Sequence, residues 1–261
     1  MNTKRIAVIS LSGGMDSTSL LIKLISEGYE VHGVSFDYGQ KHKIELERLE
    51  KNLIYLANKS FPLASYNHID LSVMGSILNS SLTNAETEIP TGHYESVNMK
   101  STVVPNRNMI FLSIIQSIAL SVALKEKSAV KISLGVHSGD HTIYPDCRKE
   151  FYDSAEIAFK EGNWDSEFVS YYMPYLEANK TMILADCFFN CKKLNLDFSA
   201  IMKNTNTSYN PDSEGRSSGT SGSDIERIEA FLNCGLDDSV PYVNGWETAK
   251  ENAFKILTEN K

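Results

Sequence analysis

The stretch RIAVISLSGGMDSTSL, residues Arg5 to Leu20, places a glycine-rich loop between two apolar segments. The β-branched run 5–11 is typical of a buried parallel strand, and the apolar residues of 16–27 recur at helical spacing. Gly13 and Gly14 remove side chains from the loop, so backbone amides can close on an anion at the positive end of the helix. The stretch therefore predicts either a phosphate cradle or a plain N-capped turn from strand to helix.

Similar patterns predict the other elements of the chain. Strands are expected at 30–36, 67–71 and 129–136, and helices at 41–57, 106–125, 146–162, 178–194, 223–234 and 246–259. The polar, aperiodic segment 74–101 is expected to be a long surface loop, which is more typical of a lid or binding loop than of a plain linker. The alternation of strands and helices predicts a doubly wound parallel α/β sheet with right-handed crossovers.

Composition narrows the class of protein. The chain has 261 residues, 42% of them hydrophobic and 22% charged, as folded soluble proteins do. Its net charge of −8 argues against a broad nucleic-acid-binding face. No apolar run is expected to approach the roughly 20 residues of a membrane span, and the N-terminus lacks the pattern of a signal peptide. The four cysteines fit free thiols in a reducing compartment, so we expect a cytoplasmic protein without membrane or nucleic-acid partners.

Four short motifs carry a resemblance to a known family. SGGMDS at 12–17 resembles the SGGxDS signature of the PP-loop ATP pyrophosphatases, and the lysine of a Walker loop is absent. FDYGQ at 36–40, VPNRN at 104–108 and YPDCR at 144–148 follow in the order found in the 7-cyano-7-deazaguanine synthase (QueC-like) family. With these motifs the chain resembles that family over nearly its whole length.

The resemblance implies a fold and an activity. The fold is a PP-loop/HUP-like five-stranded sheet with a small helical C-terminal lobe, divided into domains 1–170 and 171–261. The implied enzyme uses ATP and Mg²⁺ to adenylate the carboxylate of 7-carboxy-7-deazaguanine, releasing pyrophosphate, and adds an amine or ammonia with loss of AMP. A second ATP would convert the amide into the nitrile. Family analogy also implies a homodimer.

Roles for individual residues follow from the same resemblance. The ATP-binding set is Ser10, Ser12, Gly13, Gly14, Asp16 and Ser17, and the catalytic set is Asp16, Arg107 and Lys180. The substrate-binding set is Tyr38, Gln40, Asn108, Asp140, Tyr144, Asp146 and Arg148. Three alternatives stay open: an Arg107 that only caps or pairs, a solvated Lys180, and a 140–148 loop that closes on itself. His137 and His141 are expected to make ordinary polar contacts, and His42 is expected either to line the mouth of the substrate pocket or to be an exposed helix residue.

The chain departs from the family pattern near its C-terminus. Family members carry four zinc-binding cysteines there, and the segment 206–227 of this chain places Ser208, Ser218, Ser221 and Asp224 at those positions. Hydroxyls are poor zinc ligands, so no zinc is expected, and the serine- and glycine-rich composition predicts a loosened segment. Cys187, Cys191 and Cys234 are expected to be packed thiols.

Two other functions remain open at this stage. One is a divergent QueC-like enzyme of an antiphage operon, which would transfer the activated deazaguanine to an amine of a partner protein. The other is a non-catalytic nucleotide-binding scaffold, against which the intact SGGMDS and PNRN motifs argue.

Overall fold

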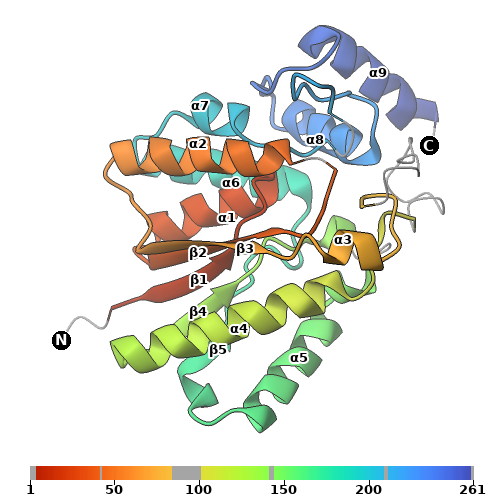
Figure 1. The fold of residues 1–261 in the computed structure, drawn as a ribbon. Coiled ribbons are helices and arrows are strands. Elements are labelled where there is room, and N and C mark those ends of the chain that lie inside the picture. The colour runs from red at the N-terminus through yellow and green to blue at the C-terminus, as the bar shows by residue number, and fades with distance from the viewer. Residues whose placement is uncertain (1–3, 42, 84–100, 141–143, 209–210, 260–261) are drawn as a thin grey trace.

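A parallel five-stranded sheet forms the centre of the protein (Figure 1). The computed structural model describes residues 4–41, 43–83, 101–140, 144–208 and 211–259. The strands are β1 (Ile6–Ser10), β2 (Glu30–Asp37), β3 (Ser65–Asp70), β4 (Val130–Ser133) and β5 (Val169–Tyr171), in the order β3-β2-β1-β4-β5. The strand order switches at β1: β2 and β3 lie on one side of it, and β4 and β5 lie on the other. Doubly wound sheets bind ligands at this switch point, here between β1 and β4. The predicted fold class is confirmed.

Helices cover both faces of the sheet (Figure 1). One face carries α1 (Met15–Ser26), α2 (Ile44–Asn58), α6 (Lys180–Lys193) and α7 (Phe198–Lys203), and the other carries α4 (Arg107–Glu126) and α5 (Lys149–Gly162). The short α3 (Met74–Ile77) follows β3 in the chain, and α8 (Gly222–Asn233) and α9 (Gly245–Glu259) form the C-terminal lobe. The result is a three-layer α/β/α arrangement.

The alternation of β1 side chains explains the two cores. Ala7 and Ile9 belong to the cluster on the α1 and α6 face, whereas Ile6 and Val8 belong to the cluster on the α4 face. All four are at most 1% exposed, as expected for a central strand buried on both sides.

The core on the α1 face continues beyond residue 170. Ile183 and Leu184 of α6 and Phe231 of α8 pack in the same cluster as Ile9. A smaller cluster between α8 and α9, built around Ile228 and Ala253, is the lobe's own core. The division at 170/171 stays a prediction.

Several elements differ from the sequence-based expectations. The sequence pattern predicts no residue range for β5 or α7, because a three-residue edge strand and a six-residue helix leave little periodicity. The expected loop 74–101 begins with α3, and its residues 84–100 lie outside the described structure.

The expectation that no apolar run approaches a membrane span was also wrong. The helix α4 is 20 residues long with a mean hydropathy of 1.6 over its most apolar window, enough by length and composition to cross a membrane. Serines and Gln116 interrupt its run of apolar letters without lowering the average much. One side of α4 packs on the sheet core through Leu112, Ile115 and Ala119.

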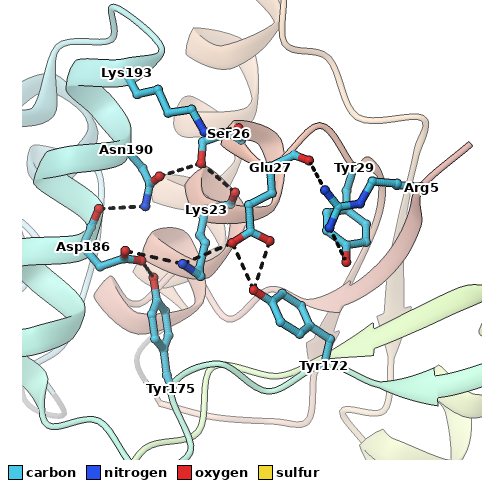
Figure 2. Close-up of polar contacts among 10 residues, drawn as sticks. All are labelled: Arg5, Lys23, Ser26, Glu27, Tyr29, Tyr172, Tyr175, Asp186, Asn190 and Lys193. Carbon is cyan, nitrogen blue, oxygen red and sulfur yellow. Dashed lines mark hydrogen bonds and ion pairs between the residues drawn. The ribbon is translucent and has the colours of Figure 1, made fainter. Parts of the chain in front are cut away.

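A polar network fixes α1 and α6 side by side (Figure 2). Lys23 of α1 forms ion pairs with Glu27 (3.2 Å) and with Asp186 of α6 (3.5 Å). Ser26 Oγ donates to Asn190 Oδ1 (2.5 Å), and Lys193 Nζ donates to the Ser26 carbonyl (2.7 Å). Because these contacts pair the two helices in the same order along the chain, the helices run parallel and begin at the same end of the sheet.

Candidate active site

The loop after β1 has a geometry that requires glycine. Gly13 has φ +83°, and a Cβ at this residue would overlap the carbonyl oxygen of Glu45 in α2. Ser12 Oγ accepts a hydrogen bond from the Gly14 N–H (3.2 Å) and lies 3.1 Å from Ser17 Oγ. Gly14 is the N-cap of α1 and offers no capping side chain, so amides of the first turn are available to an anion.

A cavity of about 250 Å³ opens at the carboxyl ends of β1 and β4. Nine of the predicted site residues line it: Ser10, Ser12, Gly14, Asp16, Ser17, Tyr38, Arg107, Asn108 and Lys180. Gly13 does not line the cavity, but its lack of a side chain lets the loop pass close to the Glu45 carbonyl. The structure thus brings together the glycine loop, the β2 end and the α4 start, which are far apart in sequence.

Charged groups meet at one end of this cavity. Lys180, the first residue of α6, is buried and lies 3.5 Å from Asp16 Oδ2 and 2.8 Å from Glu226 Oε2 of α8. His137 is also buried, with Nε2 3.7 Å from Asp16 Oδ2, while its Nδ1 accepts the Gly139 N–H (3.1 Å). The alternative of a solvated Lys180 is therefore excluded.

A second part of the cavity lining combines aromatic rings with Arg107. Its guanidinium lies over the Tyr38 ring at 5.4 Å, Nη1 donates to the Tyr38 hydroxyl (3.3 Å), and Nε donates to Asn108 Oδ1 (3.3 Å). Phe36 and Phe111 stack with centroids 4.1 Å apart beside them. This wall presents flat apolar surface and a cation to the same space.

Glu45 is a buried carboxyl of the cavity that sequence reasoning missed. It accepts a hydrogen bond from Gln40 Nε2 (3.1 Å), and Gln40 is held in turn by the Tyr38 N–H and the Phe36 carbonyl. Burial raises the pKa of Glu45 from its ordinary 4.5 to about 8. Gln40, predicted to bind substrate, is not part of the cavity lining, and its side-chain amide contacts Glu45.

Three other predicted substrate residues lie away from the cavity lining. Tyr144 is buried and its hydroxyl lies 2.6 Å from Thr102 Oγ1, Asp146 is half-buried, and Arg148 is the exposed N-cap residue of α5. Cys147, between them, does line the cavity. The side chain of Asp140 and all of His42 and His141 lie outside the described structure.

Four further residues line the cavity without having been assigned to the site from the sequence. They are His137 after β4, for which only ordinary polar contacts were expected, and Asn206, Thr207 and Ser223 of the C-terminal part of the chain. Asn206, Thr207 and Ser223 reach the cavity through tertiary packing, for which the sequence has no local signal. The Asn206 N–H donates to the Gly13 carbonyl (2.9 Å), which brings the C-terminal segment onto the glycine loop. The position of His137 just after a central strand was the one signal available.

Ser208, Ser218, Ser221 and Asp224, which stand where the family pattern has zinc-binding cysteines, converge around the Asp224 carboxylate. Asp224 Oδ2 accepts hydrogen bonds from the hydroxyls of Ser208 (3.0 Å), Ser218 (2.7 Å) and Ser221 (2.8 Å). The amides of Gly219 (3.1 Å) and Ser221 (3.3 Å) donate to the same oxygen. We call these four side chains the Asp224 cluster. The expectation of a loosened segment is wrong for these residues, because three of the four are at most 2% exposed and all are hydrogen-bonded.

The cysteines stand apart from this cluster. Cys187 and Cys191 are buried free thiols with their sulfurs 4.0 Å apart on α6, and Cys234 is a half-buried free thiol. Within the described residues, no group of three or more His, Cys, Asp or Glu side chains is arranged to hold a metal ion. The absence of zinc remains a prediction.

Comparisons with known proteins define the class and then the family. The family model "Queuosine biosynthesis protein QueC" matches residues 6–235. The chain is 42% identical over 235 residues to 7-cyano-7-deazaguanine synthase 1 of Colwellia psychrerythraea, covering 90% of this chain and 97% of the relative. It is 39% identical over 236 residues to the 7-cyano-7-deazaguanine synthase of Methanoregula boonei, covering 90% and 98%. A solved NMN synthetase from Francisella tularensis matches with a TM-score of 0.38 and 13% identity, covering 98% of this chain and 87% of that chain.

The matches identify an ATP-dependent enzyme of the PP-loop superfamily. Within that class, the chain belongs to the QueC family.

Proposed function

We propose that the chain adenylates the carboxylate of 7-carboxy-7-deazaguanine and joins the activated acid to ammonia. The supporting observation is that one cavity combines an anion cradle with an aromatic wall bearing a cation. The cradle is the glycine loop at the start of α1, and the wall is formed by Phe36, Tyr38 and Arg107. A nucleotide triphosphate and a flat bicyclic acid need these two surfaces next to each other.

Adenylation solves a specific chemical problem. Ammonia cannot displace an oxygen from a carboxylate, because the carboxylate is anionic and its oxygen leaves poorly. In the proposed step a carboxylate oxygen attacks the α-phosphorus of ATP, the bond to the β-phosphate oxygen breaks, and pyrophosphate leaves. Ammonia then attacks the acyl carbon, the C–O bond breaks, AMP departs with that oxygen, and the nitrogen loses a proton to give the amide.

The residues of the cavity fit these charges. Amides at the start of α1 would hold the phosphates, and Lys180 and Arg107 would offset the charge that builds on the α-phosphate. Asp16 Oδ1 is buried and has no hydrogen-bond partner in the described part of the chain, which suits a carboxylate that binds Mg²⁺. Glu45 lies at the same cavity with a raised pKa, so it can exchange a proton with the incoming amine near neutral pH.

We further propose that the amide is converted to the nitrile at the same cavity. The amide oxygen would attack a second ATP, and loss of AMP and two protons would leave the carbon–nitrogen triple bond. Both carboxylate oxygens then end in AMP, one in each molecule. We also propose that the chain is cytoplasmic and that it forms a homodimer. Light scattering on the purified chain tests the homodimer.

The decisive experiment uses the acid labelled with ¹⁸O in its carboxylate. The chain is incubated with it, ATP, Mg²⁺ and ammonia, and every product is weighed by mass spectrometry. We expect one ¹⁸O per AMP and a nitrile product, and loss of both in Asp16→Ala but not in Glu229→Gln, which changes a carboxylate of α8 outside the cavity lining. Amide alone refutes the second step. Unlabelled AMP refutes adenylation of the acid, and the absence of AMP favours a non-catalytic scaffold.

The same assay separates the remaining alternative. With a candidate partner protein in place of ammonia, a protein adduct of the deazaguanine mass would identify a conjugating enzyme. Its absence, with nitrile formed from ammonia, supports the proposal made above.

A further inference from the structure

Lys180 occupies a position that is electrostatically unfavourable for a cation. It is the first residue of α6, and it lies 3.5 Å from Asp16 in the first turn of α1. The positive ends of two helix dipoles therefore meet at its ammonium group. The side chain is only 7% exposed, so water compensates little of this. Lys180 needs protein counter-charge to remain charged and pointed into the cavity.

Glu226 forms a shorter ion pair with Lys180 than Asp16 does. Its Oε2 lies 2.8 Å from Lys180 Nζ, against 3.5 Å for Asp16 Oδ2, and Asp16 is shared with His137. Glu226 Oε2 is itself buried and has no hydrogen bond of regular geometry within the described part of the chain. The ion pair with Lys180 is thus what compensates the burial of this carboxylate.

The helix that carries Glu226 is anchored on both sides of it. Two residues earlier, Asp224 gathers the Asp224 cluster at the start of α8. The next residue, Arg227, is completely buried and forms two hydrogen bonds with Asp238 (2.6 and 2.9 Å). On the cavity side, a Cβ at Gly139 would collide with the Glu226 carboxylate, so the side chain has little room to turn away.

We infer that Glu226 is a positioning residue that holds Lys180 in the cavity, which makes α8 of the C-terminal lobe part of the ATP site. Glu226 does not line the cavity and acts through Lys180. The inference rests on the proposed function only in that Lys180 meets the phosphates of ATP. The ion pair itself exists without any ligand.

The first test measures the position of Lys180 without any ligand. The chain is treated briefly with an amine-reactive succinimidyl ester, and labelling of each lysine is read by peptide mass spectrometry. In Glu226→Gln we expect Lys180 labelling to rise about five- to tenfold, because the ammonium group loses the negative charge of its ion-pair partner and becomes more reactive and more accessible. Labelling of Lys23 should stay unchanged. Glu229→Gln on the same helix is the control. Lys180 labelling within about twofold of the unsubstituted chain would overturn the inference.

A second variant perturbs Glu226 without changing its charge. A Cβ at Gly139 would overlap the end of the Glu226 side chain and would also press on the His137 ring, and the backbone of Gly139 is not in the left-handed region. Gly139→Ala is expected to raise Lys180 labelling in the same direction as Glu226→Gln. Unchanged labelling in Gly139→Ala counts against the inference.

The second test asks whether Glu226 acts through Lys180. We expect Glu226→Gln to lower kcat about tenfold with the dissociation constant for ATP changed less than about threefold, and to have almost no effect in a Lys180→Met background. An undiminished effect in that background overturns the inference. Removing both charges avoids an uncompensated carboxylate, so the double variant should unfold no more easily than Lys180→Met.

The two proposals fail in different ways. If the unsubstituted chain makes no deazaguanine product, the cycle is run on the free energy of unfolding instead of kcat. The labelling result stands regardless. Lysine labelling that responds to Glu226 while no product forms refutes the proposed function alone.

Discussion

Asp224→Ala tests how much the C-terminal lobe depends on one carboxylate. The change removes the acceptor of five hydrogen bonds. The three serine hydroxyls can rotate toward other acceptors, but the amides of Gly219 and Ser221 cannot. Each stranded amide costs about 1–3 kcal/mol, and the bond from the Ser221 amide is also the Asp224 half of the α8 capping box. Relief of the buried charge offsets part of this, which leaves an expected loss of about 3 kcal/mol in the free energy of unfolding.

Equilibrium unfolding in urea measures this loss. Trp246 packs against Phe231 and Tyr242 in the lobe, so its fluorescence reports the transition. Asp224→Asn keeps one oxygen acceptor, so its free energy of unfolding should lie between that of the unsubstituted chain and that of Asp224→Ala. The control Glu229→Ala should change the free energy of unfolding by less than about 0.5 kcal/mol. A loss below about 1 kcal/mol for Asp224→Ala, or an equal loss for Asp224→Asn, would show that the hydrogen bonds of the Asp224 cluster contribute little.

Four further predictions use the same unfolding assay or a metal assay. Gly13→Ala should cost about 2–4 kcal/mol, from its positive φ and the clash with a backbone carbonyl, while Gly14→Ala should cost less than about 1 kcal/mol because its φ of −78° suits alanine; similar costs would contradict the geometry. Glu45 binds its proton more tightly in the folded state, so its contribution to stability falls as pH rises from about 4.5 to 8; Glu45→Gln should therefore gain about 3–4 kcal/mol on the unsubstituted chain between about pH 5 and 8, and parallel pH curves would disprove this. Arg227→Met should cost about 3–5 kcal/mol, since it leaves the buried Asp238 carboxylate without its cation; a loss under about 1 kcal/mol would refute this. Cysteine at all four positions of the Asp224 cluster should bind one zinc ion per chain by mass spectrometry, whereas no bound zinc would show that the positions do not converge closely enough.

The part of the site that sequence predicts is the part encoded locally. The SGGMDS loop combines strand, loop and helix within 20 residues, so the order of its letters is enough to predict a phosphate-binding geometry. Arg107 and Lys180 are identified only through the family resemblance. Their placement depends on α4 and α6 packing against opposite faces of the sheet, which no local pattern encodes.

The residues that were missed depend on tertiary burial. Glu45 looks like an ordinary charged residue of an amphipathic helix, and only its burial against the glycine loop gives it a raised pKa. Glu226 likewise belongs to a charged helix face, and nothing in the sequence pairs it with a lysine 46 positions earlier. Serine-rich composition misled for a related reason: around Asp224 the same hydroxyls that favour solvated loops satisfy a buried carboxylate.

The hydrogen bond from the Asn206 amide to the Gly13 carbonyl has a practical consequence for anyone dissecting this protein. A fragment that stops near residue 170 would keep every residue of the glycine-rich signature. It would still lack the hydrogen bond from Asn206 to the loop backbone, and it would lack Lys180. Chains shortened from the C-terminus should be judged by nucleotide affinity rather than by whether the signature is retained.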